Sequence, residues 1–152
     1  MSDSHSAPIR LLDALVRLQG RLRGAFAEVQ HGTGLSQMEH TVLAAVAEAR
    51  SAPTVPQIGR SLGHPRQVIQ RAANALRAKG LILVTDNPDH KRAQLLSATS
   101  AGAAIQAECN RRAEAIAKRL QEQTEPVRLE QAIVLVEAIR ADLDAGARGD
   151  GA

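Results

Sequence analysis

The stretch from Thr54 to Thr99 constrains the fold more than any other part of this 152-residue chain. It contains a short segment with helical spacing, a break at Gly63, a longer helical segment, and then a basic region with the pattern of two strands around a turn. Two helices joined by a tight glycine turn and followed by a hairpin are typical of a winged helix-turn-helix. The sequence therefore predicts a winged helix-turn-helix lobe over residues 35–99.

The helix starts in this lobe carry recognisable capping signals. Residues 36–39 and 54–57 both fit the capping-box pattern, in which a hydroxyl side chain and a later Glu or Gln satisfy each other's backbone N–H groups. The third helix is predicted from Pro65 to Lys79, since proline suits a first turn and Gly80 supplies a stop.

This third helix has one apolar side and one polar side. Ala72, Ala73 and Leu76 mark the apolar side, together with either Val68 or Ile69. Arginine can bind guanine bidentately, Asn and Gln can do the same for adenine, and a major groove admits one helix. We therefore predict that the outward side contacts double-stranded DNA through Arg66, Gln67, Gln70, Arg71, Asn74 and Arg77.

The hairpin is predicted from residues 81–84 and 94–98, which read as strands around a charged turn containing Pro88. Lys91 and Arg92 lie near its tip, so the wing is predicted to enter a minor groove, where the negative potential of a narrow groove attracts an arginine. The predicted DNA contacts of the wing are His90, Lys91 and Arg92.

The positive charge of the chain is concentrated in this lobe. Between Arg60 and Arg92 there are seven basic and two acidic residues, a local net charge of +5. Because the whole chain carries +3, the remainder carries −2. The charge therefore permits a polyanionic partner without demanding one, and the basic balance belongs to this stretch and not to the chain at large.

The flanking segments have apolar residues at steps of three and four and predict helices over residues 8–31 and 100–145. In a monomer these helices would expose a large apolar surface, and such surfaces usually mark partners. We therefore predict a homodimer formed by these helices. Residues 1–7 and 146–152 are small or polar and are predicted to be disordered.

Four motifs resemble the MarR (multiple antibiotic resistance regulator) family of transcription factors: LSQMEHTVLAAV, SLGHPRQVIQRAANALRAKGLI, NPDHKRAQLLSAT and TSAG. The resemblance implies a mostly helical fold with a small β-wing, and a dimeric regulator, most simply a repressor, on a pseudo-palindromic operator. It also implies that Arg71 is the recognition-helix arginine and Arg92 the wing arginine. The chain departs from the family pattern at His90, Gln70 and Asn74, which stand where an aspartate, a threonine and an acidic residue are usual.

Many relatives release DNA when a small aromatic acid or phenol binds beside the dimerisation helices. This chain has a single aromatic residue, Phe26, so an aromatic stacking cage is hard to build. A pocket for an effector would be aliphatic, with an arginine or histidine anchor.

Several alternatives stay open. Cys109 fits either a redox sensor or, more commonly for a cysteine in an apolar stripe, a packing residue. A metal site is an alternative for four scattered residues, although no tight ligand spacing supports it: His31, Glu39, His40 and Glu108.

The predicted activity is not enzymatic. The chain has no Gly-rich phosphate loop, nucleophile elbow or H-E-x-x-H helix, and no cofactor is predicted. With one cysteine, no signal-like segment and no long apolar run, a cytoplasmic protein without a membrane partner is expected. The alternative function is a winged-helix dimerisation module that does not read a specific DNA sequence.

Overall fold

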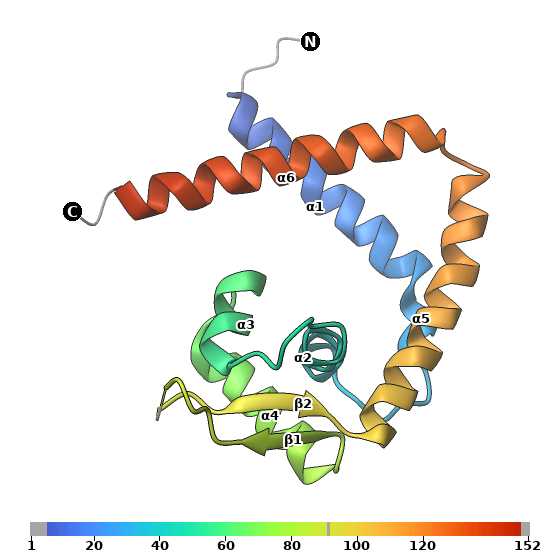
Figure 1. The fold of residues 1–152 in the computed structure, drawn as a ribbon. Helices are drawn as coiled ribbons and strands as arrows, with labels where there is room; N and C mark the ends of the chain where they lie inside the picture. Colours follow the sequence, from blue (N-terminus) through green and yellow to red (C-terminus); the bar gives the residue numbers. More distant parts are fainter. Residues whose placement is uncertain (1–5, 91, 150–152) are drawn as a thin grey trace. The chain divides into compact units, whose positions relative to one another are not determined.

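The computed structural model describes residues 6–90 and 92–149. The chain is mostly helical with one two-stranded antiparallel sheet, which confirms the predicted fold class (Figure 1). It forms two compact units, residues 1–113 and 114–152. The elements are α1 (Ala7–Ala25), the 3-10 helix η1 (Ala27–Gln30), α2 (Gln37–Ala47), α3 (Val55–Leu62), α4 (Arg66–Ala78), β1 (Ile82–Thr85), β2 (Leu95–Ala98), α5 (Ser100–Gln121) and α6 (Pro126–Gly149).

The first unit holds one apolar core, enclosed by α2, α3, α4 and the β1–β2 hairpin (Figure 1). Its largest fully buried side chains come from α2, α4 and both strands: Val42, Leu43, Ile69, Leu76, Ile82 and Leu96. The apolar side of α4 is thus led by Ile69, while Val68 is only half-buried. Burial of these side chains is the main favourable contribution to folding of the lobe.

Both predicted capping boxes are formed. Ser36 Oγ accepts from Glu39 N at 3.2 Å, and Glu39 Oε2 accepts from Ser36 N at 2.9 Å. Thr54 and Gln57 cap α3 in the same reciprocal way. Gly63 then ends α3 with φ +66°, a left-handed conformation that favours glycine. The tight turn of the helix-turn-helix depends on this residue.

The wing pairs Ile82 with Ala98 at one end and Thr85 with Leu95 at the other. The link before α3 also takes part, which the sequence did not predict. Thr54 forms a bridge with Leu95, and Leu96 N donates to Pro53 O at 2.8 Å. The start of β2, next to the hairpin loop, is therefore tied to the start of α3.

A close junction joins the wing to α5. Thr99 N donates to Leu81 O at 3.0 Å, its hydroxyl donates to Gly80 O at 2.8 Å, and the same oxygen accepts from Gly102 N at 3.1 Å. Thr99 is therefore the N-cap residue of α5. A Cβ at Gly102 would lie 2.1 Å from Leu81 O, so only glycine fits where the first turn of α5 packs against the backbone just before β1.

The first helix differs from the prediction. The sequence predicts one helix over residues 8–31, whereas α1 begins at Ala7, ends at Ala25 and is followed by the separate 3-10 turn η1. Gly24 lowers the helix propensity there, and Phe26 leaves the α conformation at φ −95°, ψ 9°.

Two helix ends also differ. Helix α4 begins at Arg66, so Pro65 occupies the N-cap position and not the first turn. Helix α6 continues to Gly149, so the disorder predicted from Gly146 is wrong for residues 146–149, where Ala145, Ala147 and Arg148 favour helix. The disorder predicted for residues 1–5 and 150–152 lies outside the described residues.

Helices α1 and α6 leave their apolar side chains exposed. Helix α1 has no buried residue, and every α6 residue from 126 to 146 is exposed in the single chain. The largest exposed side chains on α1 are Ile9, Leu12, Leu15, Val16, Leu18 and Leu22, and those on α6 are Val127, Leu129, Ile133, Val134, Leu135, Val136, Ile139 and Leu143.

Candidate nucleic-acid interface

Helix α4 separates a buried side from an exposed side. Ile69 and Leu76 are completely buried, and Ala72 and Ala73 nearly so, which fixes the rotation of the helix against the core. The predicted DNA-contact residues all lie on the exposed side: Arg66, Gln67, Gln70, Arg71, Asn74 and Arg77. The helix therefore presents donors and acceptors outward with little hydrocarbon between them.

Two of these outward residues are bound to each other. Gln70 Nε2 donates to Asn74 Oδ1 at 3.0 Å, one helical turn along the exposed side. This leaves Gln70 Oε1 and the Asn74 amide N–H groups for a ligand. The two predicted amide readers therefore form a joined pair, which the sequence did not predict.

A groove of about 750 Å³ lies between α3, the start of α4 and the wing. Three arginines from three different elements line it, Arg60 of α3, Arg66 of α4 and Arg92 of the wing, with Asp89 as an opposing charge. A channel bordered by guanidinium groups attracts phosphate oxygens. The sequence prediction missed Arg60 because its place opposite Arg92 depends on how the wing folds back.

The wing tip has a defined turn. Asn87 Oδ1 accepts from Asp89 N at 3.0 Å, and its carbonyl accepts from His90 N at 3.2 Å. Ala93 N then donates to His90 O at 3.1 Å. These bonds hold the exposed His90 and Arg92 in one turn beside the groove. The predicted contact Lys91 lies outside the described residues.

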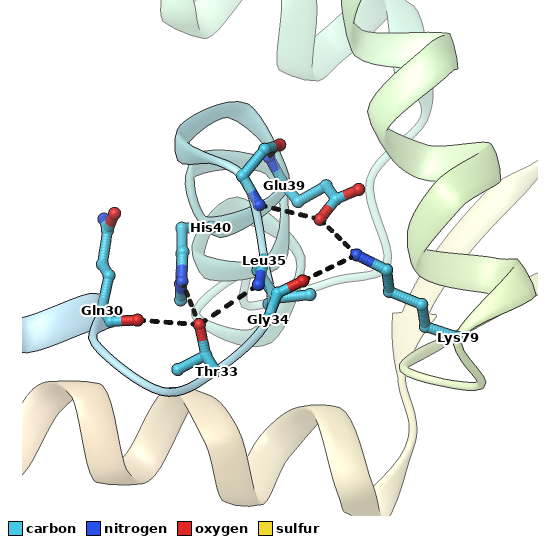
Figure 2. Close-up of polar contacts among 8 residues, drawn as sticks. Gln30, Thr33, Gly34, Leu35, Glu39, His40 and Lys79 are labelled. Atoms are coloured by element: carbon cyan, nitrogen blue, oxygen red, sulfur yellow. Dashed lines mark hydrogen bonds and ion pairs between the residues drawn. The ribbon is translucent and has the colours of Figure 1, made fainter.

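The other end of α4 is anchored to α2 by Lys79. Its Nζ donates to Glu39 Oε2 at 2.7 Å and to Gly34 O at 3.0 Å (Figure 2). The hydrogen bond from Lys79 is the main cause that lowers the pKa of the Glu39 carboxyl. Because the Glu39 side chain is 12% exposed, this ion pair is less screened by water than a surface pair. It fixes the C-terminal end of the candidate DNA-contact helix.

The loop before α2 is held by a second set of bonds around Thr33 (Figure 2). The Thr33 hydroxyl donates to Gln30 O at 2.9 Å, because a carbonyl can only accept. Its oxygen then accepts from Leu35 N at 3.3 Å and from His40 Nε2 at 2.7 Å. When the one hydroxyl proton lies on the Gln30 carbonyl, His40 Nε2 is the donor in this contact and Nδ1 is the acceptor nitrogen of a neutral ring. Burial, the main cause, lowers the pKa of His40 and favours this neutral form.

Cys109 and the residues considered for a metal site each have other contacts and do not form one cluster. Cys109 is 5% exposed in α5, and burial raises the pKa of its thiol, which favours packing over reactivity. Glu108 pairs with Arg111 and Arg112, and Arg112 also donates to His31 O at 2.9 Å. Across residues 6–90 and 92–149, no three His, Cys, Asp or Glu side chains gather as a metal site.

Comparison with known proteins identifies the family. A MarR family profile matches residues 33–93, which span the helix-turn-helix and most of the wing. The uncharacterized proteins Rv2011c of Mycobacterium tuberculosis and Mb2034c of Mycobacterium bovis are each 35% identical over 121 residues, covering 80% of this chain and 83% of the relative. The chain belongs to the MarR family.

Solved structures agree with this assignment. A MarR mutant from E. coli complexed with operator DNA superposes with a TM-score of 0.75 at 19% identity, covering 91% of this chain and 99% of that one. CouR from Rhodococcus jostii RHA1, bound to p-coumaroyl-CoA, gives a TM-score of 0.75 at 24% identity, covering 91% and 95%. The fold is therefore the winged-helix fold of these structures. Within the described part of the chain, no helix is long and apolar enough to cross a membrane.

Proposed function

We propose that this MarR-family protein is a homodimeric repressor that binds a pseudo-palindromic operator and is released by a small-molecule effector. In this proposal α4 enters the major groove and contacts bases through Arg66, Arg71 and the Gln70–Asn74 pair. The wing residue Arg92 enters the adjacent minor groove. A protein with two such lobes reads half-sites about one helical turn of DNA apart.

The observation that carries this proposal is the arrangement of arginines around one groove. Arg60, Arg66 and Arg92 come from separate elements and border the channel between α3 and the wing. A DNA strand along this channel would have a phosphate beside Arg60, while Arg66 faces the major groove and Arg92 the minor groove. The net charge of +5 between residues 60 and 92 supports the same partner.

The proposed dimer rests on the exposed apolar side chains of α1 and α6. Side chains such as Leu12, at 63% exposed, and Ile133, at 56%, are too numerous for the surface of an isolated chain. A second copy of the chain covers them in the proposed assembly. The effector part is supported by the small molecule bound to CouR.

The decisive experiment titrates the full-length protein against a palindrome from its own promoter and against random DNA, at several salt concentrations. We expect the palindrome to bind at least ~10³-fold more tightly, with a steep negative salt dependence. Arg71→Ala should lower specific affinity by about 1–3 kcal/mol, because it removes one base contact. The matched control is Arg119→Ala, which removes an exposed arginine from the last turn of α5.

Three outcomes separate this function from the alternatives. Equal affinity for both DNA sequences would indicate a dimerisation module that does not read sequence. Unchanged specific binding in Arg71→Ala would remove that residue from the interface. An equal loss in Arg71→Ala and Arg119→Ala would mean that only net charge matters.

A further inference from the structure

A second cavity of about 570 Å³ lies on the side of α2 that faces α5, away from the wing groove. Residues from η1, α2, α3 and α5 line it, all within the first unit: Val29, Gln30, His40, Thr41, Ala44, Ala45, Glu48, Ala49, Ser61, Leu62, Gln106, Cys109, Asn110 and Ala113. Its volume falls in the range of small-molecule sites, and aliphatic side chains form much of its wall.

Glu48 is the one charged carboxylate among the described lining residues, and no Lys or Arg lines the cavity with it. Two side-chain amides hold one of its oxygens. Gln106 Nε2 and Asn110 Nδ2 donate to Glu48 Oε1 at 3.0 and 3.2 Å, and Gln106 Nε2 also donates to Asn110 Oδ1. Glu48 Oε2 has no hydrogen bond to the described residues, so it can accept one from a ligand.

His40 offers a second acceptor. Its side chain lines the cavity and is 4% exposed, and its Nε2 lies 2.7 Å from Thr33 Oγ1. The other nitrogen, Nδ1, has no hydrogen-bond partner among the described residues. No completely buried side-chain nitrogen or oxygen of the described residues lacks a hydrogen-bond partner, so Nδ1 is not completely buried.

The charged group among the described lining residues is thus an acceptor, Glu48, beside neutral side chains such as Gln30 and Ser61 that can both donate and accept. A carboxylic acid would bring a second negative charge beside Glu48, with no cationic side chain in the wall to compensate it. An ammonium group would form a charge-assisted hydrogen bond with Glu48 Oε2, while its hydrocarbon part lies against Val29 and Leu62. The histidine predicted as an anchor is present, but it accepts a hydrogen bond and does not pair with an anion.

We propose that this cavity binds small amphipathic amines, through Glu48 and His40, and that such amines are the effectors of this protein. The effector role rests on the proposed DNA-binding function, whereas binding of an amine in the cavity does not. His40 connects the cavity through Thr33 to the segment 33–35, whose Gly34 carbonyl is held by Lys79 at the end of α4 (Figure 2). A ligand at His40 therefore acts on a segment that anchors the candidate DNA-contact helix.

The test uses three probes with one skeleton, 4-phenylbutylamine, 4-phenylbutanol and 4-phenylbutyrate, titrated calorimetrically into the full-length protein without DNA. We expect the amine to bind at least ~10-fold more tightly than the butyrate, with the alcohol between them. Concentrations up to about 10 mM suffice for a ligand of this size. Equal or tighter binding of the butyrate, or no binding of any probe, would overturn the proposal.

Variants locate the site. Glu48→Gln keeps the shape of the side chain and should bring the amine down to the affinity of the alcohol, about a tenfold loss. The control Asp86→Asn removes one negative charge from the wing, outside the cavity lining, and should leave both affinities unchanged. Ala44→Leu fills the cavity and should abolish binding. Unchanged amine affinity in Glu48→Gln or in Ala44→Leu would contradict the assignment.

A final measurement repeats the operator titration with saturating amine. We expect the operator affinity to fall at least ~5-fold, the lower end of ordinary coupling between two sites. Unchanged affinity would refute the effector role. If the protein failed to bind any operator, the DNA-binding function would fail, while the DNA-free titrations would still decide whether the cavity takes amines.

Discussion

The helix-turn-helix lobe buries its apolar side chains, whereas helices α1 and α6 leave theirs exposed in the single chain. In the lobe, Leu43, Ile69 and Leu76 are completely buried within a single chain. On the flanking helices, side chains of the same kind, such as Leu12 and Ile133, are more than half exposed. The lobe is therefore stabilised by contacts within one chain, whereas the flanking helices carry apolar surface that their own chain leaves uncovered.

The two regions should differ most in how a leucine-to-alanine substitution changes the free energy of unfolding. Leu76→Ala should lower the free energy of unfolding by about 2–5 kcal/mol, because it leaves a cavity in the core. Leu135→Ala, at a position that is 63% exposed, should change it by no more than about 0.5 kcal/mol in dilute solution. Urea unfolding at two protein concentrations measures both. If the flanks pair between chains, the cost of Leu135→Ala rises with concentration.

A smaller effect is expected on assembly. The double variant Leu12→Asp with Ile133→Asp should weaken the dimer at least ~100-fold, because burying an unpaired carboxylate is costly. Sedimentation equilibrium gives the dissociation constant. Leu83→Asp is the control, since Leu83 is 56% exposed on the wing and lies outside the proposed interface. A dimer that survives the double variant would show that these side chains face solvent in the assembly.

The smallest effect concerns pH, and it originates in the lobe. Burial lowers the pKa of His40 in the folded chain below its ordinary value of 6.5. Between the lowered pKa and pH 6.5, the unfolded chain therefore binds more protons than the folded chain. Stability is therefore complete above pH 6.5 and is lost as the pH falls through the lowered value. His40→Gln should remove this slope, whereas His64→Gln, at an exposed histidine, should keep it.

Glu39 contributes in a separate, more acidic window. Its pKa lies below the ordinary 4.5, so its contribution is present above that pH and is lost as the pH falls further. Thermal unfolding at half-unit steps from pH 7.5 to 3.5 would resolve the two. A stability curve that is flat between pH 7 and 5 in the parent protein would contradict the role given to His40.

Much of the lobe could be predicted because its signals are local. The two capping boxes lie within four residues, and Gly63 and the apolar spacing of α4 fix the turn and the buried side of the helix. These features depend on backbone hydrogen bonds and helical periodicity, which a single sequence displays directly.

The missed features join distant residues. Lys79 reaches Glu39 across forty positions, Thr54 pairs with Leu95, and Arg60 lies in one groove with Arg92. None of these contacts produces a periodic pattern in the sequence, since each depends on how the wing and α2 fold back on α4. The acceptor character of the second cavity was missed for the same reason, because it needs Glu48 beside Gln106 and Asn110.

The hydrogen bond between Gln70 and Asn74 has a consequence for how the proposed reader would search DNA. The two amides already share one hydrogen bond before any DNA is present. Contact with an arbitrary DNA sequence therefore adds few hydrogen bonds to this pair. Only a base edge that presents a donor and an acceptor together can replace what the pair gives up. The arginines would thus bind any DNA duplex, whereas the amide pair would form base contacts only at a matching sequence.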